Sequence, residues 1–163
     1  NKIGNTNRLV WYIDKYGDVE GNKRWNNYID KIKHKNQNKQ SKSSKRIKTI
    51  LDELNIKYDI EYSIRELNNH CDYYIGEFNT IIEFYGDYWH SNPIKYDKDY
   101  YHQYCKMTST EIWERDKKRI NNIYNHFNKN INIIIIWESS IINKDFLFKL
   151  LIDNKNKNNI IYI

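Results

Sequence analysis

The chain has 163 residues, a length that suits one domain or one domain with an appendage. Its net charge of +6 favours a polyanionic partner, and nucleic acid before a membrane surface, because no basic amphipathic helix with a lipid-facing stripe is present. Two cysteines are too few for a disulfide scaffold, and there is no signal peptide or apolar run of transmembrane length. We therefore expect a soluble intracellular protein without a membrane partner.

The apolar residues within 6–35 have the spacing of two helices. Residues 34–44 are polar enough to predict a linker. Over residues 23–48 the only acid is Asp30, so this segment is either a solvated face or an arm that contacts phosphates. The second interpretation makes residues 1–40 a basic helical DNA-binding arm. The basic residues assigned to DNA binding, in the arm and just after it, are Lys23, Arg24, Lys31, Lys33, Lys35, Lys39, Lys42, Lys45 and Arg46.

Residues 41–163 predict an α/β (α+β) domain in which helices flank a central mixed sheet of about four strands. Apolar residues three and four apart indicate the helices, and alternation or continuous apolar runs indicate the strands. The expected elements are a helix capped at Ser43 or Ser44, a half-buried strand over 58–64, a hairpin over 72–85, a long helix from Thr110, a buried strand over 131–137 and a helix over 144–152.

The stretch 81–90 combines a buried strand with ionisable groups. Glu83 lies inside an apolar run, where a carboxylate needs a cation or hydrogen bonds as partners. Asp72 is expected on the neighbouring strand of the hairpin, and His90 follows the strand after Gly86. Two acids and a histidine at one end of a sheet are typical of metal-assisted hydrolysis. The alternative is a salt-bridged strand beside an incidental surface histidine.

Asp116 falls on the buried face of the long helix, four residues after Ile112 and four before Ile120. A carboxylate on an apolar stripe needs a partner. We expect the two acids and the histidine at the sheet end to provide it.

Three blocks of the sequence, 83–90, 113–117 and 136–139, together resemble the very-short-patch-repair (Vsr-like) branch of the PD-(D/E)xK nucleases. The likeness is closer to phage and mobile-element homing endonucleases of the EDxHD type, and it spans residues 41–142. It implies a restriction-endonuclease-like fold and a DNA endonuclease that hydrolyses phosphodiester bonds of double-stranded DNA at a specific site. The protein would then be intracellular with access to DNA.

The resemblance also implies roles for single residues. Asp72 would bind Mg2+ or Mn2+, with a further ligand from the Glu83 carboxylate or from the backbone at Phe84. His90 would act as the general base in place of the superfamily's usual lysine, and Asp116 would orient His90 or assist the metal.

Two features of the family differ in this chain, and one is retained. Tyr88 and Trp89 match the aromatic pair that wedges between base pairs in the repair enzyme. The family's helix glutamate has no clear counterpart, so Glu53 or Glu61 would have to replace it. No structural zinc is expected, because neither Cys nor His occupies the repair enzyme's zinc positions, which fall at Asp87, Asn92, Ile94 and Ser139.

Two further functions stay open beside the homing endonuclease. One is a mismatch-repair nicking endonuclease. The other is a catalytically decayed DNA-binding module, which the missing helix glutamate favours. The presence of all four expected catalytic residues weighs against decay; these are Asp72, Glu83, His90 and Asp116.

Overall fold

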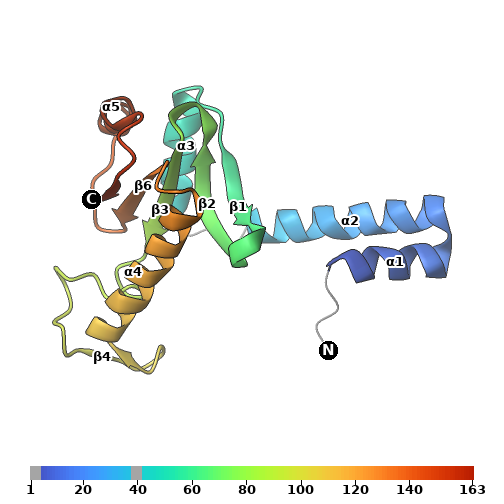
Figure 1. The fold of residues 1–163 in the computed structure, drawn as a ribbon, viewed down its shortest axis with the longest axis horizontal. Helices are drawn as coiled ribbons and strands as arrows, with labels where there is room; N and C mark the ends of the chain where they lie inside the picture. Colours follow the sequence, from blue (N-terminus) through green and yellow to red (C-terminus); the bar gives the residue numbers. More distant parts are fainter. Residues whose placement is uncertain (1–4, 38–41) are drawn as a thin grey trace. The chain divides into compact units, whose positions relative to one another are not determined.

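The computed structural model describes residues 5–37 and 42–163 (Figure 1). For residues 5–8, 29–37 and 42–44 it describes helix membership but not the side chains. The chain divides into two compact units, Asn1–Lys42 and Ser43–Ile163.

The first unit is a pair of helices, α1 (Asn5–Tyr16) and α2 (Asp18–Gln37), as the sequence predicts. Gly17 joins them with a φ of +78°, a left-handed conformation that glycine adopts without strain. The helices pack closely at Gly21, where an added Cβ would lie 2.6 Å from the Tyr12 carbonyl oxygen. Helix α2 extends further than expected, into the first residues of the predicted linker.

The second unit is a mixed α/β structure. Its elements are α3 (Lys42–Glu53), β1 (Asp59–Ile64), β2 (Asn69–Ile75), β3 (Thr80–Tyr85), β4 (Tyr101–His102), β5 (Met107–Thr108), α4 (Ser109–His126), β6 (Asn132–Trp137), α5 (Lys144–Asn154) and β7 (Ile160–Tyr162). Two short 3-10 helices, Arg65–Leu67 and Gly76–Phe78, form the turns that flank β2. Helix α3 begins at Lys42, before the expected serine cap.

The main sheet has the strand order β1-β2-β3-β6-β7. The pairs β1–β2 and β2–β3 are antiparallel, whereas β3–β6 and β6–β7 are parallel. The predicted mixed sheet flanked by helices is therefore confirmed, but the prediction of about four strands is wrong because the sheet has five. Strand β7 was missed because three residues, Ile160–Tyr162, are too few to display an alternating pattern.

Strand β6 is buried on both faces, as its continuous apolar run predicts. Ile134 and Ile136 join α3 and α5 in one hydrophobic core, while Ile133 and Ile135 join α4 in a second core on the other face. This arrangement fixes α4 against the sheet and leaves the carboxyl ends of β3 and β6 side by side.

Strand β1 departs from the expected regular alternation at one residue. Glu61 has a φ of +53°, a left-handed conformation that is uncommon outside glycine. As a result, Ile60 packs on the face of α3 and α5 whereas Tyr62 packs on the face of α4. Among the residues that the structure describes, no helix is both long and apolar enough to cross a membrane.

Candidate active site

Asp72 lies where the ladder between β2 and β3 ends. The last paired residues are Tyr73 and Ile82, and beyond them the Asp72 Oδ2 atom accepts a hydrogen bond from the backbone N–H of Phe84 at 2.7 Å. The side chain thus takes over a contact that a backbone carbonyl would make in a regular sheet. Burial raises the pKa of Asp72, although the hydrogen bond from Phe84 opposes the shift.

The irregular residue of β1 lies opposite Asp72. The pairs Ile60–Tyr73 and Tyr62–Cys71 enclose Glu61, and the Glu61 charge also raises the Asp72 pKa. Of the two acids considered as replacements for the helix glutamate, Glu61 is therefore the one near Asp72. The other, Glu53, is exposed on the last turn of α3.

Glu83 is only 4% exposed and has a cationic partner that the sequence analysis did not identify. Arg119 on α4 donates from Nη2 to Glu83 Oε1 at 2.9 Å and to the backbone carbonyl of His70 at 2.6 Å. Burial raises the pKa of Glu83 to about 7, and the charge of Arg119 opposes this shift. Arg119 follows Asp116 by three residues, so helical spacing could have indicated that it shares the same face.

His90 and Asp116 form a direct pair. The distance from His90 Nδ1 to Asp116 Oδ2 is 2.6 Å, and the other carboxylate oxygen, Oδ1, accepts from Arg115 Nη2 at 2.8 Å. Asp116 lies on the buried face of α4, as its spacing from Ile112 and Ile120 predicts. A capping box between Thr108 and Glu111 fixes the first turn of this helix.

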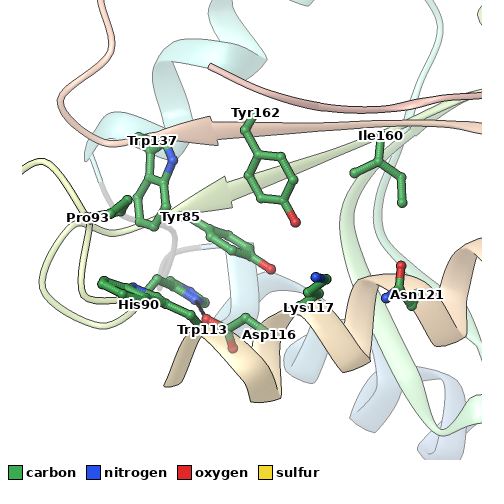
Figure 2. A pocket seen from close by; sticks show the side chains of 10 residues that line it. All are labelled: Tyr85, His90, Pro93, Trp113, Asp116, Lys117, Asn121, Trp137, Ile160 and Tyr162. Carbon is green, nitrogen blue, oxygen red and sulfur yellow. Dashed lines mark hydrogen bonds and ion pairs between the residues drawn. The ribbon is translucent and has the colours of Figure 1, made fainter. Parts of the chain in front are cut away.

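Tyr85 packs flat against the ring of His90. Their ring centroids are 3.8 Å apart and the planes differ by 8°. Figure 2 shows Tyr85, His90 and Asp116 together among the residues that line a pocket. Tyr85 follows Glu83 by two residues on β3, and this alternation could have placed both side chains on the face that α4 covers. The stack limits the orientations open to the imidazole.

The loop that carries His90 is held at both ends. The Asp87 Oδ1 atom accepts from Asn92 Nδ2 at 2.7 Å and from Ser139 Oγ at 3.2 Å, while Oδ2 accepts from Lys95 Nζ at 2.5 Å. Burial on its own would raise the pKa of Asp87, but these hydrogen bonds lower it. On the other side of the loop, Trp113 Nε1 donates to the carbonyl of Ser91 at 2.6 Å.

Three of the four residues that the sequence analysis aligned with the repair enzyme's zinc ligands, Asp87, Asn92 and Ser139, meet in one hydrogen-bonded cluster. The fourth, Ile94, donates its backbone N–H to Asn92 Oδ1 at 2.9 Å. These side chains offer neither thiolate nor imidazole, so they do not fit a structural zinc ion. The cluster links the loop after β3 to the end of β6.

The residues near Asp72 fit only a cation that takes few protein ligands. Within the described ranges, no group of three or more His, Cys, Asp or Glu side chains is arranged to hold a metal ion. Mg2+ in phosphoryl-transfer sites commonly uses one or two carboxylates, with water and substrate phosphate as its other ligands. Asp72 fits that role. Glu83 fits it less well, because Arg119 occupies one of its oxygens. Phe84 was expected to offer a backbone ligand to the metal; the contact observed at its backbone is the N–H hydrogen bond to Asp72.

The structure describes the side chains of some, but not all, of the residues that the sequence analysis assigned to DNA binding. Tyr88 and Trp89 are 39% and 50% exposed, in a loop beside His90. Lys23, Arg24, Lys45 and Arg46 are exposed, and Arg24 bonds to Glu20 at 2.7 Å. Lys31, Lys33 and Lys35 belong to α2 and Lys42 begins α3, but their side chains, and all of Lys39, lie outside the described residues.

No protein-family model matches this chain, and no curated protein shows significant similarity to it.

Proposed function

We propose that the protein is a metal-dependent DNA endonuclease that hydrolyses phosphodiester bonds with His90 as general base. The observation that carries this proposal is the contact of 2.6 Å between His90 Nδ1 and Asp116 Oδ2. A carboxylate can only accept a hydrogen bond, so Nδ1 is the nitrogen that carries a proton in this pair. In the neutral ring the lone pair is then on Nε2.

The geometry around His90 suits proton abstraction. Its side chain is 25% exposed, so water can reach the ring. An imidazole with a free nitrogen can take a proton from that water near neutral pH. Asp116 would then stabilise the imidazolium that forms, as a buried acid does beside a catalytic histidine in other hydrolases. The Tyr85 ring supports this arrangement from one face of the imidazole.

Asp72 is the residue we assign to the metal. Mg2+ or Mn2+ bound there would neutralise charge on the scissile phosphate. Glu83 and Arg119 would shape the same wall of the site, with the guanidinium 28% exposed and available to a phosphate oxygen. Phe84 contributes through its backbone, which positions the Asp72 carboxylate.

The order of elements supports a restriction-endonuclease-like fold. The run α3-β1-β2-β3-α4-β6 gives a helix, three antiparallel strands, a crossover helix and a parallel strand. The sequence blocks that resemble the Vsr-like homing endonucleases fall at the ends of β3 and β6 and on α4. The net charge of +6 and the exposed pair Tyr88 and Trp89 support double-stranded DNA as substrate. Cutting at a specific site is proposed from the resemblance to homing endonucleases.

A DNA-binding module without hydrolytic activity is the second candidate. The contact between Arg119 and Glu83 favours it, because a guanidinium already neutralises the carboxylate that a second metal contact would need. In that case the exposed aromatic and basic residues would act alone.

Incubation with supercoiled plasmid tests the proposal. The wild-type protein should give nicked or linear DNA with Mg2+ or Mn2+, and no product when EDTA is present. Retention of DNA binding without any product in either metal would favour the binding module.

A further inference from the structure

A pocket of about 480 Å3 lies next to the His90–Asp116 pair, between α4 and the ends of β3, β6 and β7 (Figure 2). This volume falls in the range of about 300–1,000 Å3 that is typical of small-ligand sites. His90 and Asp116 line one side of the pocket, so its occupant would lie beside the candidate hydrolytic centre.

Four aromatic side chains line the pocket. The rings come from β3, α4, β6 and β7, and they belong to Tyr85, Trp113, Trp137 and Tyr162. In Figure 2, Trp137 and Tyr162 project from the sheet toward Trp113 and Lys117 on α4. Rings on several sides of an apolar space suit a flat aromatic ligand, because every nucleobase has a face on which such rings can stack.

The pocket also contains an unsatisfied polar group. Tyr85 is 3% exposed, and its hydroxyl group has no hydrogen-bond partner among the described residues. Leaving such a group unpaired is costly. The oxygen itself is closed to solvent, so a ligand with a donor or acceptor would satisfy it only after a small movement of the surrounding side chains. In Figure 2 the hydroxyl groups of Tyr85 and Tyr162 both point toward the side that Lys117 lines. Burial raises the pKa of both phenols, so both keep their protons near neutral pH.

One cationic side chain lines the pocket and suits the phosphate of a nucleotide. Lys117 and Asn121 line the pocket and are exposed at the surface of α4. An ammonium group there can contact a phosphate while the base is enclosed.

We propose that this pocket binds the base of an unstacked nucleotide that flanks the phosphodiester bond to be cut. The inference rests on the proposed endonuclease function and adds a feature of the substrate, namely a base that has left the stack. Enzymes that enclose a single base stack it between aromatic side chains and read its edge by hydrogen bonds. Here Trp137 and Tyr162, which project side by side from the neighbouring strands β6 and β7, would contact one face of the base. The Tyr85 hydroxyl group would meet its edge once the neighbouring side chains move enough to expose the oxygen.

Binding of mononucleotides to the full chain tests this without any cleavage step. Isothermal titration calorimetry would compare dAMP, dCMP, dGMP and dTMP with deoxyribose 5-phosphate, which lacks a base. At least one mononucleotide should bind about tenfold more tightly than the sugar phosphate, because the sugar phosphate has no base to stack on an aromatic side chain.

Two variants and a control test whether mononucleotides bind in this pocket. Tyr162→Ala should weaken mononucleotide binding about tenfold, and Tyr85→Phe, which keeps the ring, should weaken it about threefold. The control is Phe148→Ala, which removes an aromatic side chain on α5 that is 41% exposed and outside the pocket. It should leave the affinity unchanged.

Equal affinity for mononucleotides and sugar phosphate, or no binding of any mononucleotide, would overturn the inference. So would unchanged affinity in both pocket variants. Failure of the proposed function gives a different result: the plasmid stays intact while mononucleotides still bind. Cleaved plasmid without base-dependent binding would instead contradict the inference about the pocket while supporting the proposed endonuclease function.

Discussion

Arg119 donates a hydrogen bond of 2.9 Å to the buried carboxylate of Glu83 and thereby joins α4 to β3. The same guanidinium group reaches the carbonyl of His70 on β2 at 2.6 Å. One side chain therefore ties together the helix that carries Asp116 and the two strands that carry Asp72 and Glu83. Its removal would affect both the stability of the domain and the shape of the candidate site.

We expect Arg119→Ala to lower the free energy of unfolding by about 3 kcal/mol, because it leaves a buried carboxylate without its cation. Urea unfolding followed by tryptophan fluorescence measures the change. Lys118→Ala, at the neighbouring exposed position, is the matched control and should change stability by less than about 0.5 kcal/mol.

A second substitution separates the charge from the packing. Adding Glu83→Gln to Arg119→Ala should restore part of the stability, since the unpaired charge is then gone. A double variant no more stable than Arg119→Ala would contradict this explanation.

The Asp87 cluster predicts a pH-dependent contribution to stability. The hydrogen bonds from Lys95, Asn92 and Ser139 lower the Asp87 pKa in the folded state despite its burial. A group with a lowered folded-state pKa stabilises the protein above its unfolded-state pKa, which is about 4, and loses this contribution as the pH falls.

Asp87→Asn should therefore destabilise the protein by about 1–3 kcal/mol at pH 7 and by progressively less as the pH falls below about 4. Urea titrations of both proteins across this range measure the difference. Asp99→Asn, an exposed acid in the same loop, should show no such pH-dependent difference. A difference for Asp87→Asn that stays constant with pH would mean that its charge makes no contribution.

Much of the fold follows from periodic patterns in the sequence. The spacing of Ile112, Asp116 and Ile120 predicts the phase of α4, and the run of four isoleucines predicts a strand buried on both faces. These signals are local, because burial repeats with the period of the helix or strand.

The interactions that the sequence did not predict depend on tertiary register. Nothing in the sequence around Arg119 indicates which strand its guanidinium group will reach, since that depends on how α4 lies on the sheet. The left-handed residue Glu61 moves Ile60 and Tyr62 to opposite faces, although both fit one alternating pattern. The stack of Tyr85 on His90 likewise requires the loop after β3 to fold back over that strand.

The basic arm provides a prediction about salt. Removal of residues 1–40 should weaken binding to a DNA duplex and reduce the slope of log affinity against log salt, by about one unit for each phosphate that the arm neutralises. Fluorescence anisotropy of a labelled duplex at several salt concentrations measures the slope, and circular dichroism checks that the shortened chain is folded. An identical slope would show that the arm does not contact DNA.

Asp116→Asn should reduce plasmid cleavage by at least about tenfold, because an amide no longer holds the proton on His90 Nδ1 in the same way. DNA binding should stay within a few-fold of the wild-type value. Glu114→Gln, an exposed position on the same helix, is the control and should cut normally. Cleavage by Asp116→Asn at the wild-type rate would mean that Asp116 is not the acid that orients His90.

The central claim is that His90 takes the proton from the attacking water, and chemical rescue of His90→Ala tests it most directly. General-base catalysis contributes about 100- to 10,000-fold, so this variant should cut plasmid at least about 100-fold more slowly while still binding DNA. Added imidazole should restore part of the rate, and it should do so more effectively as the pH rises through the range in which imidazole becomes neutral. Cleavage by His90→Ala at the wild-type rate without imidazole would contradict the claim.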